Sequence, residues 1–222
     1  HDLMQGKHDK RSNKSELKDE LKDGSYWNSV SDYTRKEIIE PYKDRIVCFT
    51  KGNHETSVMA KNELDFLALL TDNERLAKTM DTGGYILFTS TYGQTRTYPL
   101  YFQHQPPSGG NRSKGALSID ILIGQRPGVK AIITEHIHSP LMSPQTVEVL
   151  NTQQRSTKLQ NIWVIMCPTL KASDKRKIGY EFEKVKAGST TIGAVKMSFS
   201  VDRGEGDSRI FNMNPQYLLY YS

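Results

Sequence analysis

The sequence lacks the features of a membrane or secreted protein. It contains no run of about 18 apolar residues, so no transmembrane helix is predicted. Its first residues have no apolar stretch typical of a signal peptide, and no Met begins the chain. We therefore predict a cytoplasmic protein with no membrane partner, and we expect the sequence to begin inside a longer chain.

Cysteine is scarce as well, which limits the kinds of site that the chain can build. The two cysteines, Cys48 and Cys167, each lie in an apolar, strand-like run. Two buried free thiols in a reducing compartment are a better interpretation than a disulfide or a catalytic thiol. A structural zinc site is also disfavoured, because such sites usually use closely spaced Cys pairs.

The size and charge of the chain are those of an ordinary globular protein. Its 222 residues fit one domain of fair size or two small ones, and carry a net charge of +5. That charge mildly favours an anionic partner such as phosphate or nucleic acid. The basic run Lys171–Lys177 has no interleaved aromatics, so we interpret it as a solvated loop rather than a groove for single strands.

Hydrophobic patterning predicts helices mainly before residue 125 and strands mainly after it. Helices are expected around 14–21, over 31–42 with Pro41 at its end, over 62–80 with a break near 71–73, and over 113–123. Strands are expected over 45–50, 85–89, 97–103, 129–134, 161–167 and 191–201, with the second and third forming a hairpin. This pattern predicts a mixed α and β protein.

The histidines give the most informative pattern in the sequence. Four of the six, His54, His104, His136 and His138, come just after the end of a predicted strand. In α/β folds, neighbouring strand ends converge on one edge of the sheet, where ligands bind. A single histidine in such a place is usually structural or merely exposed, but four together favour a shared function.

Metal binding is the function that these residue types favour. Neutral imidazole is a good ligand for Zn, Mn, Fe and Ni. His136 and His138, two residues apart on an extended segment, point to the same side. Gly52 precedes Asn53, whose side chain offers a neutral oxygen ligand, and His54, which has a proton to give.

The ordered motifs resemble those of the calcineurin-like metallophosphoesterases. The resemblance rests on a strand followed by Gly52–Glu55, a strand ending in His104, and a strand ending in His136 and His138. The segments Leu3–Arg11, Tyr101–His104, Pro168–Lys171 and Gly179–Tyr180 are similar to a branch of that superfamily common in bacteriophages, where the host cytoplasm would be the location.

The resemblance implies a fold and a dinuclear site. The fold would be a two-sheet β-sandwich flanked by helices, of α/β (α+β) class, forming a single domain over 1–222 without its N-terminal strand. Two divalent transition metal ions (Mn²⁺, Zn²⁺, Fe or Ni²⁺) would be the cofactors. Asn53, His104 and His136 would bind one ion and His138 the other, while Glu55 would orient the loop.

The implied activity is hydrolysis of a phosphodiester or of a nucleotide or nucleic-acid phosphate. His54 would be the catalytic residue that stabilises the transferring phosphoryl group and protonates the leaving oxygen. Arg112 and Lys114 are candidates for substrate binding, as are Lys7, Arg11 and Asn111, although each could equally be a solvated surface residue.

Two departures from the family pattern leave an alternative open. The family's Asp-x-His and Gly-Asp motifs do not occur ahead of Gly52, and Glu135 occupies a position where the family usually has Gly. Asp2 is one possible substitute ligand, but we expect the missing ligands to lie upstream of the sequence. Glu135 could crowd the site or add a ligand or hydrogen bond. The alternative function is a catalytically degenerate binding or scaffold protein of this fold.

Overall fold

The computed structural model describes residues 26–91, 95–104, 112–137, 140–169, 192–203 and 209–220. The chain divides into two compact units, His1–Gly84 and Tyr85–Ser222, which we call unit 1 and unit 2. Among the described residues, each helix is too short or too polar to traverse a lipid bilayer. The expected helix around 14–21 lies outside the described residues, and the single domain stays a prediction.

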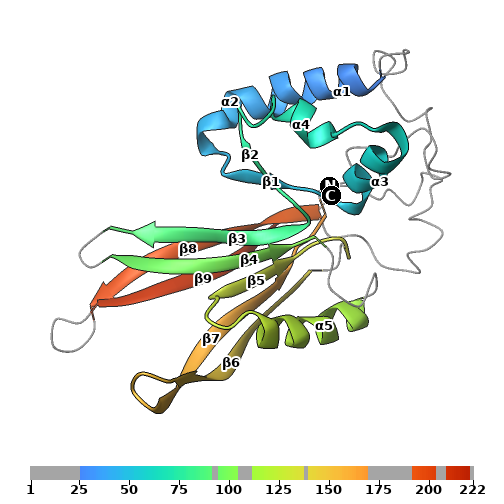
Figure 1. Cartoon of the computed structure of the whole chain (residues 1–222). Helices are drawn as coiled ribbons and strands as arrows, with labels where there is room; N and C mark the ends of the chain where they lie inside the picture. The colour runs from blue at the N-terminus through green and yellow to red at the C-terminus, as the bar shows by residue number, and fades with distance from the viewer. Residues whose placement is uncertain are drawn as a thin grey trace. The chain divides into compact units, whose positions relative to one another are not determined.

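The described part of unit 1 begins with one long helical segment (Figure 1). Helix α1 (Tyr26–Thr34) continues through a π-helical stretch, Arg35–Ile39, into α2 (Glu40–Tyr42) and a 3₁₀ turn, Lys43–Arg45. The predicted helix is confirmed, although it begins before Ser31. Pro41 lies inside this continuous segment and has no N–H to donate to the preceding turn, and the α-helical part ends one residue later.

The rest of unit 1 surrounds a small parallel pair of strands. Strand β1 (Cys48–Thr50) pairs with β2 (Lys78–Met80), and helices α3 (Asn53–Asn62) and α4 (Phe66–Leu70) lie between them in sequence. An apolar cluster holds these elements together, and its buried members are Val30, Ile39, Val58, Phe66, Leu67 and Leu70. Both strands have only three residues, so unit 1 depends on its helices for most of its core.

Two of the sequence predictions in unit 1 are wrong in part. The strand expected over 45–50 is shorter and only half-buried. The helix expected over 62–80 with a break near 71–73 ends at Leu70, because Asp72, Asn73 and Glu74 all have positive φ (53°, 51° and 69°), which a right-handed helix does not allow. The expected break is confirmed, but the helix expected beyond it is wrong, since Lys78–Met80 form β2. The helix α3 was not predicted, since its sequence is polar.

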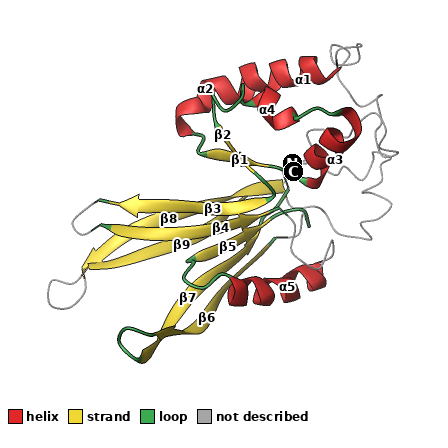
Figure 2. Ribbon diagram, viewed as in Figure 1, coloured by secondary structure: helices red, strands yellow, loops and turns green. Residues whose placement is uncertain are grey.

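Unit 2 is built on a mixed five-stranded sheet (Figure 2). The strand order is β3 (Gly83–Ser90), β4 (Arg96–Gln103), β5 (Ala131–Thr134), β7 (Ser156–Met166) and β6 (Leu141–Asn151). Strands β4, β5 and β7 run parallel, and β6 is antiparallel to β7. The carboxyl ends of three adjacent strands therefore share one edge of the sheet.

Both faces of this sheet are covered. Helix α5 (Arg112–Gln125) packs on one face through Ile119 and Leu122. The hairpin of β8 (Ile192–Arg203) and β9 (Arg209–Tyr220) packs on the other, where Val195, Met197 and Met213 contact the cluster of Leu100, Ala131, Ile133 and Ile165. The predicted mixed α+β class is confirmed, and within unit 2 one sheet packs on another with a helix outside.

Candidate functional site

The carboxyl edge of the sheet in unit 2 brings three chemically active side chains into one row. Gln103, Thr134 and Met166 are register partners across β4, β5 and β7, so the residues that follow them, His104, Glu135 and Cys167, are neighbours. The ladder continues past the strands, because Glu135 N donates to His104 O (3.2 Å) and Cys167 N donates to Thr134 O (2.8 Å).

His104 and His136 lie against each other at this edge. Their ring centroids are 5.1 Å apart, with an edge-to-face angle of 71°. The His104 side chain is only 3% exposed, and His136 is half-buried. The sequence prediction that separate strand ends deliver imidazoles to one place is thus confirmed for this pair.

The backbone at His136 is strained. Its φ is +69°, and Ile137 N donates across it to Glu135 O at 2.8 Å, which closes a three-residue turn. A positive φ is uncommon for a residue other than Gly, although it is less so for His, and such conformations cluster at functional sites. The turn reverses the chain just beyond β5 and directs the His136 ring toward His104.

Glu135 adds a negative charge beside the two rings. Its Oε2 lies 3.7 Å from His104 Nδ1, and its side chain is 25% exposed. Burial, together with a smaller effect of the Glu135 carboxylate, raises the pKa of the Cys167 thiol to about 12. Cys167 therefore stays a neutral thiol at this edge, and it is a poor metal ligand as long as it keeps its proton.

The His104–His136 pair fits two ligands of a single ion. Imidazoles bound through nitrogen at about 2.1 Å, with a near-tetrahedral angle between them, have ring centroids roughly 5 Å apart. Within the described part of the chain, however, no group of three or more His, Cys, Asp or Glu side chains could hold a metal ion. A metal ion bound by this pair would need further ligands from outside the described residues or from water.

Unit 1 presents the other candidate residues at the start of a helix. Gly52 follows β1 and caps α3 with φ −96° and ψ 179°, an extended conformation that any residue can adopt, so the backbone here does not require glycine. Asn53 and His54 are the first residues of α3, half-buried and buried respectively. Glu55 Oε2 accepts from Gly52 N at 2.9 Å, so Glu55 does orient this loop.

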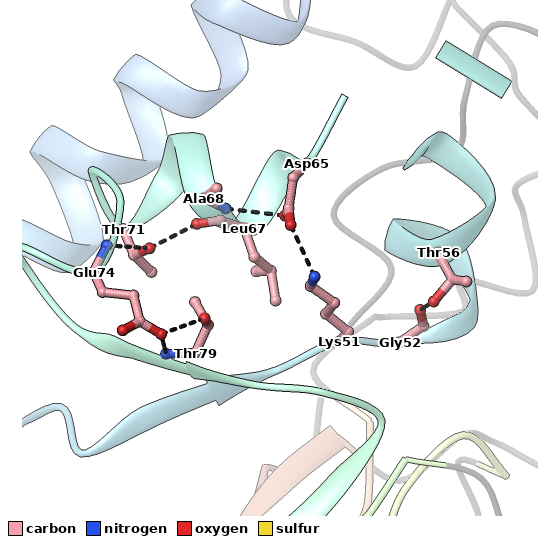
Figure 3. A network of polar contacts seen from close by, with 9 residues as sticks. All are labelled: Lys51, Gly52, Thr56, Asp65, Leu67, Ala68, Thr71, Glu74 and Thr79. Atoms are coloured by element: carbon pink, nitrogen blue, oxygen red, sulfur yellow. Dashed lines mark hydrogen bonds and ion pairs between the residues drawn. The ribbon is translucent and has the colours of Figure 1, made fainter. Parts of the chain in front are cut away.

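A polar network fixes the position of this helix start (Figure 3). Lys51 Nζ pairs with Asp65 Oδ2 at 2.8 Å, and Asp65 Oδ1 caps α4 by accepting from Ala68 N. Thr56 Oγ1 donates to Gly52 O at 2.8 Å. Strand β2 has polar contacts of its own: Glu74 accepts hydrogen bonds from the N–H and the hydroxyl of Thr79. These bonds lower the pKa of Glu74 to about 2. Short strands are thus supported by side-chain bonds.

The remaining predicted residues are only partly visible. His138 lies outside the described residues, as do Lys7, Arg11 and Asn111. Arg112 and Lys114 are in the first turn of α5, but their side chains are outside the description. That the His104–His136 pair and the Asn53–His54 pair share one site stays a prediction.

The sequence leaves the role of Glu135 open and indicates only a buried thiol at Cys167. Both residues lie at the ends of predicted strands, and this position is the signal in the sequence that could have placed them in the site. What the sequence lacked was the strand order, because nothing in it shows that β7 neighbours β5. A hollow in unit 1, lined by Glu40, Lys43, Asp44, Arg75 and Leu76, contains none of the predicted site residues.

No protein-family model matches this chain, and no curated protein matches it either.

Proposed function

We propose that the chain is a metal-dependent phosphoesterase that hydrolyses a phosphodiester or a nucleotide or nucleic-acid phosphate at a dinuclear metal centre of calcineurin-like type. The observation that carries the proposal is the pair of imidazoles, His104 and His136, 5.1 Å apart at the ends of adjacent parallel strands. Neutral imidazole is a common ligand of transition metals, and here two come from neighbouring strand ends.

The roles of the residues follow from their chemistry. His104, His136 and Asn53 would hold one ion, and His138 the other. When bound, two divalent ions polarise the phosphoryl group and supply a nucleophile at neutral pH. His54, at the start of α3, would give a proton to the leaving oxygen, a contribution of typically 10²–10⁴-fold. Arg112 and Lys114 would bind the substrate.

The test is hydrolysis of bis-p-nitrophenyl phosphate by the full-length protein with added Mn²⁺. Wild type should turn over and lose activity with a chelator, and His54→Ala should lower kcat by about 10²–10⁴-fold. Met59→Ala is the matched control, because Met59 is exposed on the same helix. Turnover unaffected by His54→Ala would refute the role of His54.

A catalytically degenerate binding protein of the same fold is the second candidate. It is favoured by Glu135, a carboxylate where the family usually has Gly, and by the lack of a three-residue ligand group among the described residues. Full-length protein that binds about two transition ions per chain and hydrolyses the substrate contradicts this candidate. Full-length protein that binds none supports it.

A further inference from the structure

Glu135 is held in a fixed place beside His104. Its N–H donates to His104 O (3.2 Å) and its C=O accepts from Ile137 N (2.8 Å), so its backbone is bonded on both sides. Glu135 is the first residue of the turn at His136, where φ is +69°. The backbone position of Glu135 is therefore fixed at this edge of the sheet.

The carboxylate faces one particular atom of His104. Oε2 of Glu135 lies 3.7 Å from Nδ1, which is within ion-pair range but longer than the roughly 2.7–2.9 Å of a charge-assisted hydrogen bond. The His104 side chain is 3% exposed, so little water competes for this nitrogen. Both atoms are buried, and a hydrogen bond between them requires the two side chains to move closer together.

We propose that Glu135 is a positioning residue for His104: by accepting a hydrogen bond from Nδ1–H, it selects the tautomer that leaves the lone pair of Nε2 available for a metal ion. Histidines that bind metals commonly donate their other N–H to a carboxylate, which fixes the ring and raises its basicity. The inference rests on the proposed metal site, and it gives a purpose to the carboxylate that departs from the family pattern.

The raised pKa of Cys167 agrees with this arrangement. The Glu135 carboxylate contributes to that shift, so its charge acts at this same edge. Cys167 keeps its proton and is neutral. Of the three neighbours His104, Glu135 and Cys167, Glu135 therefore carries the negative charge.

The direct test reads the tautomer of His104 in the metal-free full chain. Long-range ¹H–¹⁵N spectra of protein labelled on histidine, recorded at about pH 8, should show His104 protonated on Nδ1 in wild type. In Glu135→Ala the signal should shift toward the Nε2–H form. Glu135→Gln keeps a side-chain acceptor and should retain the wild-type tautomer in part. Glu148→Ala, which removes an exposed carboxylate from the same sheet, should change nothing.

Zinc affinity provides a second reading. Glu135→Ala should weaken Zn²⁺ binding by roughly 10–100-fold, whereas Glu148→Ala should not. An Nε2–H tautomer in wild type, or a His104 tautomer unchanged in Glu135→Ala, would overturn the inference even if the protein binds metal. Absence of Zn²⁺ binding by wild type would instead refute the proposed function, while the tautomer of His104 still reports on Glu135.

Discussion

The two candidate regions are held in place by different forces. At the helix start in unit 1, Lys51–Glu55 is positioned by an ion pair and by bonds between side chains and backbone, around strands of three residues. At the sheet edge in unit 2, His104 and Glu135 extend parallel strands whose residues, such as Leu100 and Ile132, are fully buried. In unit 1 a single polar contact can be removed without changing the others. In unit 2 the position of the edge depends on the packing of the whole buried sheet.

The two cysteines offer the largest expected contrast. Cys48 lies in β1, and burial raises its pKa; Cys167 lies at the unit 2 edge with a pKa of about 12. In metal-free native protein at pH 8, Cys167 should be alkylated on the order of 10³-fold more slowly than an ordinary thiol, because only the thiolate reacts. Mass spectrometry over time measures the alkylation rate of each cysteine. As a control, the two rates should be equal in denaturant. Labelling of Cys167 as fast as that of Cys48 would contradict the contrast.

A core substitution tests how strongly the unit 2 edge depends on burial. Ile132, at 0% exposure in β5, packs against α5, so Ile132→Ala should lower the free energy of unfolding by about 2–5 kcal/mol. Chemical denaturation measures this loss. Leu87→Ala, at an exposed position of β3, is the control and should cost less than about 0.5 kcal/mol. Equal losses in both variants would argue against a core-supported edge.

Asp65 provides the matching test in unit 1. Asp65→Ala removes both the cap of α4 and the pair with Lys51, and should cost about 1–2 kcal/mol of stability. Asp65→Asn keeps a good capping side chain and loses only the partly exposed pair, so it should cost about 0–1 kcal/mol. Urea denaturation measures the free energy of unfolding of both variants. A larger loss of stability in Asp65→Asn than in Asp65→Ala would contradict these roles of Asp65.

The same residue gives a smaller, pH-dependent effect. Partial burial raises the pKa of Asp65, but the hydrogen bond from Lys51 and those from the α4 backbone outweigh it, so the net pKa is lowered. A depressed folded pKa means that the contribution is fully present above about pH 4 and is lost as the pH falls through the folded value. Wild type should therefore lose stability on acidification more than Asp65→Asn does. Wild type and Asp65→Asn that lose stability equally as the pH falls would contradict a depressed pKa at Asp65.

The sequence alone predicted the local features better than the long-range ones. Gly52–Glu55 and the strand preceding it were recognisable because their signal is contained in a few consecutive residues. The pairing of His104 with His136 was predicted from strand ends, and the sheet confirms it. The break near 71–73 was predicted, but the left-handed conformation of Asp72–Glu74 was not, since none of its residues is Gly. Local hydrogen bonds, such as that from Asn73 N to Ala68 O, hold it. Nor was the row containing Cys167 predicted, because it depends on strand order.

The central claim is that His104 and His136 bind the same ion. Calorimetric titration of full-length protein with Zn²⁺ tests it in wild type, His104→Ala, His136→Ala and the double variant. We expect each single change to lower the Zn²⁺ affinity of the same site by at least roughly 10–100-fold, the loss usual when a residue that supports a metal ligand is removed. The losses from the two changes should be non-additive. Strictly additive losses, or two variants that each lose a different ion, would contradict a shared ion.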